Sequence, residues 1–212
     1  MSTFKEIQGR NIRSYTTNPD NPLEGQMWYN QTELKLKGVT ASGAWASSSL
    51  MTNVKSYRFG GGTQTAAFAA GGSSLIASTE EYNGSGWSAG GDLGTGRYEG
   101  GSAGSLTAGL IFGGYSTAVL ANTEEYNGTS WSEQNDLNNK GYSQGGFGTQ
   151  TAAVYTSRYD TTASPIYITD AEEYNGTSWS EGNNPSTFRG DVGTAGTLTA
   201  GMIFGGQNAA SS

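Results

Sequence analysis

Four short runs of small and apolar residues recur along the chain, each opened by a threonine and most of them closed by a Gly-Gly pair. A short continuous apolar run bounded by turn signals is typical of a strand buried on both faces, and a glycine pair lets another backbone approach the strand end closely. We therefore expect four buried strands, and the third lacks its Gly-Gly ending because Ser157 and Arg158 stand there. The runs are TAAFAAGG, TAGLIFGG, TAAVYTSR and TAGMIFGG, beginning at Thr65, Thr107, Thr151 and Thr199.

A polar word of the form Glu-Glu-Tyr-Asn-Gly-x-x-Trp alternates with these runs. Asn-Gly is the strongest short signal for a β-hairpin, because both residues accept a positive φ. The tyrosine and the tryptophan then project from the same face of the hairpin. We expect each pair to pack between neighbouring repeat units, at Tyr82 and Trp87, Tyr126 and Trp131, and Tyr174 and Trp179.

The two words share one period. Trp45, in the weaker copy SGAWASSS, precedes Trp87, Trp131 and Trp179 by steps of 42, 44 and 48 residues, and the threonines of the apolar runs are separated by the same steps. Repeats of this length that contain several strands indicate the blades of a propeller.

A di-glycine after an apolar strand, then an acidic pair, then Tyr and Trp resembles the kelch repeat over roughly residues 55–206. The resemblance implies an all-β fold, a β-propeller of four-stranded blades. A split unit would close a four-bladed ring by pairing the N-terminal and C-terminal half-blades; the alternative is a natural chain that continues with more blades. The expected parts are an extended docking arm at 1–25 and a propeller at 26–212, with units at about 55–98, 99–143, 144–189, and 190–206 plus 26–47.

Composition narrows the function classes. Glycine supplies 34 of 212 residues, which disfavours long helices. The formal net charge is −7 and no Lys/Arg-rich run occurs, so we expect no nucleic-acid partner. Cysteine and histidine are absent, which removes thiolate chemistry and the commonest general base. We expect no cofactor, no metal and no membrane span.

The string NPDNPLEGQMWYNQTELKLKG carries a second resemblance, to the start of structural proteins of tailed bacteriophages, especially marine ones. It implies a virion surface component, such as a tail fibre, an appendage or a capsid decoration protein, assembled in the host cytoplasm. The arm at 1–25 would bind other virion proteins, and a homo-oligomer is plausible. The matching residues are Pro22, Gly25, Met27, Trp28, Tyr29, Asn30, Leu34, Lys35, Leu36 and Lys37.

Charged residues recur with the repeat. A basic residue precedes each predicted inner strand, and in a closed ring these four would form a positive collar for an anionic or glycan ligand. We favour the alternative, in which they pair with the repeated carboxylates. Because the acidic pairs recur in every unit, we expect hydrogen bonding within the repeat rather than metal or acid–base chemistry. The basic residues are Arg58, Arg97, Lys140 and Arg189; the acidic pairs are Glu80/Glu81, Glu124/Glu125 and Glu172/Glu173.

Tyrosines outside the hairpins are candidates for stacking on sugars, because aromatic side chains on loops are common binding groups. Tyr159 and Tyr167 are preferred, since they adjoin the segment Asp160–Asp170, which we expect to be the most irregular loop. The full set is Tyr57, Tyr98, Tyr115, Tyr142, Tyr155, Tyr159 and Tyr167.

The favoured function is a non-enzymatic structural component of a bacteriophage virion that displays a propeller to host surface glycans. The alternative is a free carbohydrate-binding lectin or adhesin. We expect no enzyme activity, because kelch-type copper oxidases need histidine and cysteine, and no carboxylate pair stands apart from the repeat to hydrolyse a glycosidic bond.

Overall fold

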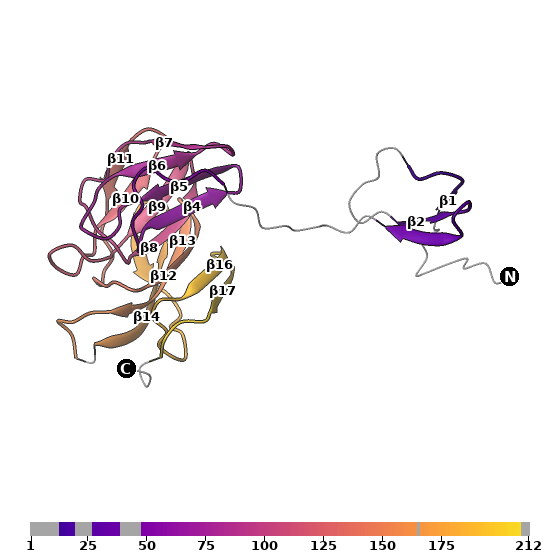
Figure 1. The fold of residues 1–212 in the computed structure, drawn as a ribbon. Coiled ribbons are helices and arrows are strands. Elements are labelled where there is room, and N and C mark those ends of the chain that lie inside the picture. Colours follow the sequence, from indigo (N-terminus) through magenta and orange to yellow (C-terminus); the bar gives the residue numbers. More distant parts are fainter. Residues whose placement is uncertain (1–12, 20–26, 39–47, 165, 209–212) are drawn as a thin grey trace. The chain divides into compact units, whose positions relative to one another are not determined.

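The computed structural model describes residues 13–19, 27–38, 48–164 and 166–208, and the chain divides into two compact units, Met1–Ser47 and Ser48–Ser212. Every regular element in the described residues is a β-strand (Figure 1). The predicted all-β class is therefore confirmed.

The first unit contains one three-stranded sheet, with β1 parallel to β2 and β2 antiparallel to β3. Trp28 on β2 is only 5% exposed, and its Nε1 donates a hydrogen bond to Asn18 Oδ1 at 3.3 Å. Asn30 Nδ2 donates to the same oxygen at 2.9 Å. The strands are β1 (Arg13–Tyr15), β2 (Met27–Asn30) and β3 (Lys35–Gly38).

The second unit contains three four-stranded antiparallel sheets and one two-stranded sheet, each wound up and down in chain order. Sheet I is β4 (Phe59–Thr63), β5 (Ala66–Ala70), β6 (Thr79–Tyr82) and β7 (Trp87–Ala89). Sheet II is β8 (Gly101–Ser105), β9 (Ala108–Phe112), β10 (Thr123–Tyr126) and β11 (Trp131–Gln134). Sheet III is β12 (Gly145–Thr149), β13 (Ala152–Tyr159), β14 (Tyr167–Tyr174) and β15 (Trp179–Glu181). Sheet IV is β16 (Gly193–Thr197) and β17 (Ala200–Phe204).

Consecutive sheets pack through their first strands, β4 on β8, β8 on β12 and β12 on β16, in a propeller-like arrangement. The residues just before these first strands form backbone hydrogen bonds with one another, and these bonds connect neighbouring sheets. Glu99 N donates to Tyr57 O at 3.3 Å, Ser143 N to Glu99 O at 2.7 Å, and Asp191 N to Ser143 O at 3.1 Å. All four residues have φ between 53° and 59°, which turns the chain into each first strand.

The predicted hairpins form in sheets I, II and III, with each tyrosine directly opposite its tryptophan. The tryptophans pack on the preceding sheet, as expected: Trp131 lies edge-on to Phe68 at 5.6 Å between ring centroids, and Trp179 to Phe112 at 4.7 Å. Their indole nitrogens donate to Thr79 and Thr123 of the preceding sheet, both at 2.9 Å. The repeat is therefore a device for stacking one sheet on the next.

The two halves of the predicted split unit fall in different compact units, and their pairing stays a prediction. The β2 and β3 strands, from the predicted N-terminal half, are paired with each other and with β1, whereas β16 and β17 form a sheet of two strands. The boundary between the two compact units lies at 47/48, and β1, which lies within the predicted arm at 1–25, pairs with β2. Trp45 lies outside the described residues.

Candidate functional site

Six tyrosines and one phenylalanine form a continuous row across the second unit, which we call the tyrosine strip. Neighbouring ring centroids are 5.0–6.1 Å apart along the whole row. In order the members are Tyr57, Tyr98, Tyr115, Tyr142, Tyr159, Tyr167 and Phe188.

The backbone places these rings in pairs. Tyr98 and Tyr115 exchange two hydrogen bonds at 3.1 and 2.8 Å, and Tyr142 and Tyr159 do the same at 3.1 and 2.9 Å. Each pair lies where the first two strands of a sheet diverge, so successive sheets bring successive pairs together. Tyr115 of sheet II thereby meets Tyr142 of sheet III, edge-on at 5.5 Å.

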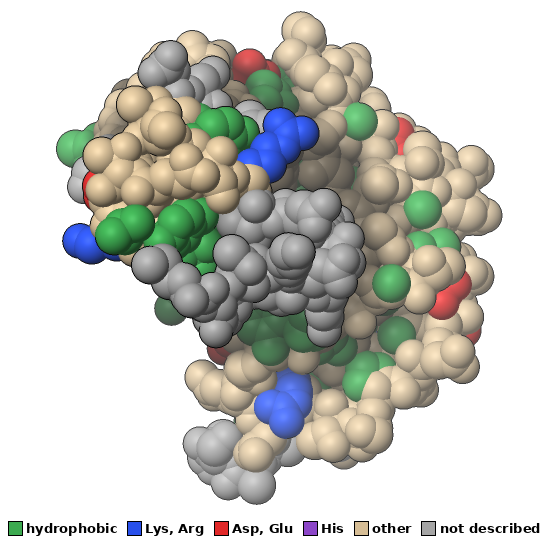
Figure 2. All heavy atoms as spheres, turned by 90° about the vertical axis from the view of Figure 1, so that its right-hand side faces the viewer, with side chains coloured by type: hydrophobic (Ala, Val, Ile, Leu, Met, Phe, Trp, Pro, Cys, Tyr) green, Lys and Arg blue, Asp and Glu red, His purple; other side chains and the backbone are tan. Residues whose placement is uncertain are grey.

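The strip is accessible from solvent. Tyr57 is 58% exposed, the next five tyrosines are half-buried, and Phe188 anchors the end of the row in a buried position. Figure 2 shows one face of the molecule, on which hydrophobic side chains are scattered among polar and charged ones. Glu99 lies near the strip, where its charge contributes to raising the pKa of Tyr98 and of Tyr142. Burial and the neighbouring Tyr159 raise the pKa of Tyr142 to about 12, so its hydroxyl stays protonated at neutral pH. The strip thus offers flat apolar faces edged with neutral hydroxyl groups.

Six of the seven tyrosines that were predicted from the sequence lie in the strip, and Tyr155 does not. Tyr155 is fully buried, and its hydroxyl donates to Asp170 Oδ1 at 3.0 Å. It lies on β13, where it packs edge-on to Phe112 of sheet II. Phe188 was not predicted from the sequence, where its place shortly before the first strand of sheet IV is the only signal for it.

Two of the four basic residues are buried in ion pairs rather than displayed on a collar. Arg97 is fully buried, with Nη1 2.9 Å from Glu124 Oε1. Arg58 Nη1 lies 3.2 Å from Glu80 Oε1, and its Nη2 donates to the backbone oxygens of Ala69 and Ser78. These two residues therefore pair with the repeated carboxylates, which is the arrangement that we favoured from the sequence.

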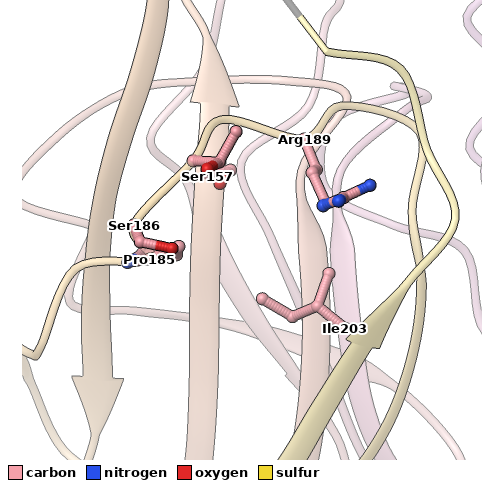
Figure 3. Close-up of a pocket in the computed structure, with 6 residues that line it drawn as sticks. Ser157, Pro185, Ser186, Arg189 and Ile203 are labelled. Atoms are coloured by element: carbon pink, nitrogen blue, oxygen red, sulfur yellow. The ribbon is translucent and has the colours of Figure 1, made fainter.

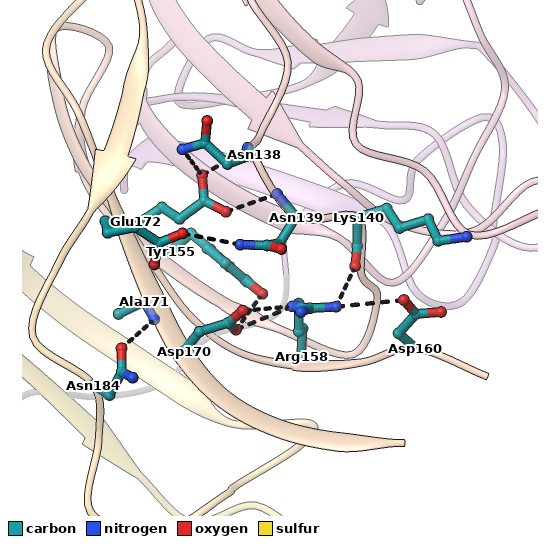
Figure 4. A network of polar contacts seen from close by, with 11 residues as sticks. Asn138, Asn139, Lys140, Tyr155, Arg158, Asp160, Asp170, Ala171, Glu172 and Asn184 are labelled. Carbon is teal, nitrogen blue, oxygen red and sulfur yellow. Dashed lines mark hydrogen bonds and ion pairs between the residues drawn. The ribbon is translucent and has the colours of Figure 1, made fainter. Parts of the chain in front are cut away.

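The other two basic residues are exposed. Lys140 offers its backbone oxygen to Arg158, while its side chain extends away from that contact (Figure 4). Arg189 Nη1 donates to Gly205 O at 3.0 Å. A collar of four accessible cations is therefore absent, and Arg189 stands beside sheet IV without a carboxylate partner among the described residues.

The first glutamate of each acidic pair anchors the loop that leads into its own sheet. Glu80 accepts from the backbone amides of Thr52 and Asn53 at 2.7 and 2.8 Å, and Glu172 accepts from those of Asn138 and Asn139 at 2.8 and 2.9 Å. Burial acts to raise the pKa of Glu80, but the two amides and Arg58 outweigh it and lower the pKa. For Glu172, which has no arginine partner, burial prevails and the pKa is raised.

The second glutamate receives a tyrosine from the following sheet. Tyr126 donates its hydroxyl hydrogen to Glu81, and Tyr174 donates to Glu125 Oε1 at 3.0 Å. Glu81 and Glu125 are therefore half-buried contacts between neighbouring sheets. In the first two pairs, both glutamates therefore make contacts within the stack of sheets.

Sheet III departs from the repeat in a polar network (Figure 4). Arg158 Nε donates to both oxygens of Asp170, at 3.1 and 2.8 Å, and its Nη1 lies 3.4 Å from Asp160 Oδ2. The strands β13 and β14 continue to Tyr159 and from Tyr167, so the predicted loop at 160–170 is shorter than expected. A bulge between Thr156 and Arg158 allows this extension.

Among the described residues, no group of three or more acidic, histidine or cysteine side chains is arranged to hold a metal ion. In that same part of the chain, no helix has the length and apolarity needed to cross a membrane.

Comparison with known proteins bears on the fold alone. No protein-family model matches the sequence, and no curated protein matches it. Among solved structures, one of YjhT is similar with a TM-score of 0.54 and 14% identity, covering 64% of this chain and 54% of that one. The chain thus spans about half the length of that structure, and what the two share is an all-β, propeller-like fold.

Proposed function

We propose that this chain is a non-enzymatic recognition module of kelch-like repeats that binds glycans along the tyrosine strip. The observation that carries the proposal is the unbroken row of rings from Tyr57 to Phe188. Tyrosine has an apolar face and a polar tip, which suits a ligand with both C–H faces and hydroxyl groups. The raised pKa values of Tyr98 and Tyr142 keep their hydroxyl groups protonated at neutral pH, which suits hydrogen bonding with a polyhydroxy ligand.

The scaffold supports recognition because the rings are held by hydrogen-bonded strand ends rather than by free loops. Aromatic side chains with few rotatable bonds lose little conformational entropy when they bind. The buried arginine–glutamate pairs and the tyrosine–glutamate contacts between sheets keep the spacing of the row fixed. Binding would therefore not have to order the surface first.

We further propose that the module is a surface component of a bacteriophage virion. This rests on the N-terminal resemblance, whose Trp28 and Asn30 are buried in the first unit and so help to build it. In this proposal the first unit attaches to the particle and the second unit presents the strip. The absence of histidine and cysteine from the sequence favours a role without catalysis.

A glycan array tests the recognition proposal. We expect the full-length protein to bind a defined set of glycans, and Tyr115→Ala with Tyr142→Ala to lose most of that binding. Tyr82→Ala is the matched control, because Tyr82 is also half-buried but stacks on Trp87 in a hairpin outside the strip. Binding that survives in the double variant, or that is lost equally in the control, would refute the strip as the binding surface.

Particle incorporation separates a virion component from a free lectin. If the first unit attaches the protein to a virion, then deleting residues 1–47 should abolish incorporation and leave glycan binding intact. A particle that incorporates the shortened protein normally would rule out this role for the first unit. The glycan-binding proposal would stand in either case.

A further inference from the structure

Sheet IV exposes surfaces that the other sheets bury. The third strand of sheets I, II and III covers the edge of the second strand, whereas β17 has no such neighbour among the described residues. Met202 and Phe204 on β17 are 60% and 52% exposed, although Leu110 and Phe112 at the same positions of β9 are fully buried. An unpaired strand edge of this kind is a template for the addition of another strand.

The repeat specifies what such a strand would carry. In sheet II, β10 pairs with β9 so that Glu124 lies opposite Ile111 and Tyr126 opposite Gly109. The Glu124 carboxylate accepts from Gly94 N at 2.8 Å and from Arg97 Nη1 at 2.9 Å. The equivalent of Ile111 on β17 is Ile203, so an added strand in this register would place a glutamate opposite Ile203.

The place of that glutamate is an open pocket in sheet IV (Figure 3). A pocket of about 160 Å³ is lined by Ser157, Pro185, Ser186, Thr187, Arg189 and Ile203. Counting from the first strand of each sheet, Ser186 and Arg189 occupy the positions of Gly94 and Arg97. In the close-up, the Arg189 and Ile203 side chains project toward the same space. The pocket therefore has the amide and the guanidinium that hold a carboxylate in sheet II.

A second vacancy, in this case a hydrogen-bond acceptor without its donor, lies on sheet III. Glu81 and Glu125 each accept from a tyrosine of the following sheet. Glu173 is the equivalent residue of sheet III, and it receives no tyrosine hydroxyl among the described residues. A tyrosine two residues after the added glutamate would reach it, as Tyr174 reaches Glu125.

From these two vacancies we propose that the β17 edge is a docking site for a hairpin of a partner chain, which carries the Glu-x-Tyr-Asn-Gly-x-x-Trp pattern and fills the pocket at Arg189 with its glutamate. The partner adds to the sheet by main-chain hydrogen bonds, and its side chains set the register. The carboxylate is complementary in charge to Arg189, which gives the site its selectivity.

The segment first considered for this edge does not supply the required carboxylate. In every complete hairpin the glutamate lies seven residues before the tryptophan, as Glu124 does before Trp131. Seven residues before Trp45 stands Gly38, which has no side chain to enter the pocket. The three hairpins with the full pattern are already paired inside sheets I, II and III. None of these three hairpins is free to fill the site, and the occupant that we propose is a hairpin of a partner chain.

A peptide of residues 121–134, labelled with a fluorophore, is a direct probe, and its binding to the full-length protein can be followed by fluorescence anisotropy. We expect saturable binding that falls about tenfold or more when the peptide carries Glu124→Gln or the protein carries Arg189→Gln, since each change removes a charge-assisted contact. The matched control is Glu125→Gln in the peptide, an identical change of charge at a residue whose side chain faces away from the pocket; its affinity should be nearly unchanged.

A variant that binds the peptide more tightly serves as a second test, because misfolding could explain a loss of binding but not a gain. Thr79 and Thr123 accept the indole N–H of the following tryptophan, but sheet III has Ala171 at that position. Ala171→Thr should tighten peptide binding several-fold, because it supplies the missing acceptor. No binding by the unaltered protein, equal loss for Glu124→Gln and Glu125→Gln, or no gain for Ala171→Thr would each overturn the proposal.

Discussion

The two carboxylates of Glu80 and Glu172 occupy equivalent positions, yet their pKa values move in opposite directions. Both are buried and both accept two backbone amides, but only Glu80 has an arginine, Arg58, beside it. In sheet III the corresponding basic residue is Lys140, whose side chain is exposed, and the buried Arg158 pairs with Asp170 rather than with Glu172. One ion pair therefore decides whether a buried carboxylate in this repeat is stabilised in its charged form.

Glu80→Gln should destabilise the second unit more than Glu172→Gln at pH 7. The lowered pKa of Glu80 means that its ionised form stabilises the fold above the ordinary glutamate pKa of about 4.3, and that this contribution disappears as the pH falls through that range. The raised pKa of Glu172 has the reverse sign: its ionisation opposes folding as the pH rises. We expect a loss of about 1.5–3 kcal/mol for Glu80→Gln, measured by urea unfolding at pH 7.

The same comparison at pH 4 supplies the control. The difference between the two variants should shrink there, because protonation already removes the advantage of a charged Glu80. Equal losses at both pH values would show that the ion pair with Arg58 does not distinguish the two sites.

Thr123 is a buried acceptor for the indole of Trp179, at 2.9 Å. Thr123→Val keeps the shape of the side chain but leaves the indole N–H without a partner, so we expect a loss of about 1–3 kcal/mol. Thr107→Val is the control, since Thr107 is exposed. Thermal unfolding checks both variants, and a similar melting temperature for the two would contradict a role for Thr123 in joining sheets II and III.

At the scale of the elements, the hairpins were predictable because their signals are local. Asn-Gly fixes the turn, and the turn fixes Tyr126 opposite Trp131. The pairing of β1 with β2 was not predictable, because Arg13–Tyr15 carries no alternation of apolar and polar residues. The fourth apolar run forms β17 as expected, but it is largely exposed, since burial depends on a neighbouring strand rather than on the run itself.

The sequence predicts most of the residues of the candidate site, but it does not predict that their rings form one continuous row. Six of the seven predicted ligand tyrosines lie in the row, at or beside the ends of strands. That the rings touch from one sheet to the next follows from how the sheets stack, which no local pattern contains. Tyr155 was misplaced although the repeat already assigned it to a buried strand: it stands at the position of Ile111 in sheet II, and both residues are fully buried.

The backbone conformation of Ser157, at the bulge in β13, can be tested by substitution. Ser157 has φ 52°, whereas the equivalent position in sheet II is Gly113 with φ 60°. We expect Ser157→Gly to be neutral or to stabilise by up to about 1 kcal/mol, because glycine adopts this conformation without steric cost. Urea unfolding against the unaltered protein measures the effect.

Gly113→Ala is the opposite change at the matching position. An added Cβ would lie 2.8 Å from Gly141 O and closer still to the Gln144 amide, in addition to the unfavourable φ. We expect clear destabilisation by about 1–3 kcal/mol. If Ser157→Gly were instead the more damaging variant, the assignment of these two positions as equivalents would be wrong.

At the scale of the whole molecule, the second unit should fold without the first. Residues 48–53 belong to it, because the amides of Thr52 and Asn53 bind Glu80 of sheet I. A fragment 48–212 should keep the unfolding transition of the second unit, whereas a fragment 57–212 should melt at a lower temperature. Equal melting temperatures for the two fragments would show that residues 48–56 do not stabilise sheet I.

The tyrosine strip is tested most directly by ¹⁹F NMR of the full-length protein labelled with 3-fluorotyrosine, titrated with the glycan that binds best on the array. Single Tyr→Phe variants assign the resonances. The resonances of Tyr98, Tyr115, Tyr142 and Tyr159 should shift together as the site saturates. Those of Tyr126 and Tyr174, which are buried between sheets, should stay in place. Shifts confined to tyrosines outside the strip, or no shift of the strip at saturating ligand, would contradict this prediction.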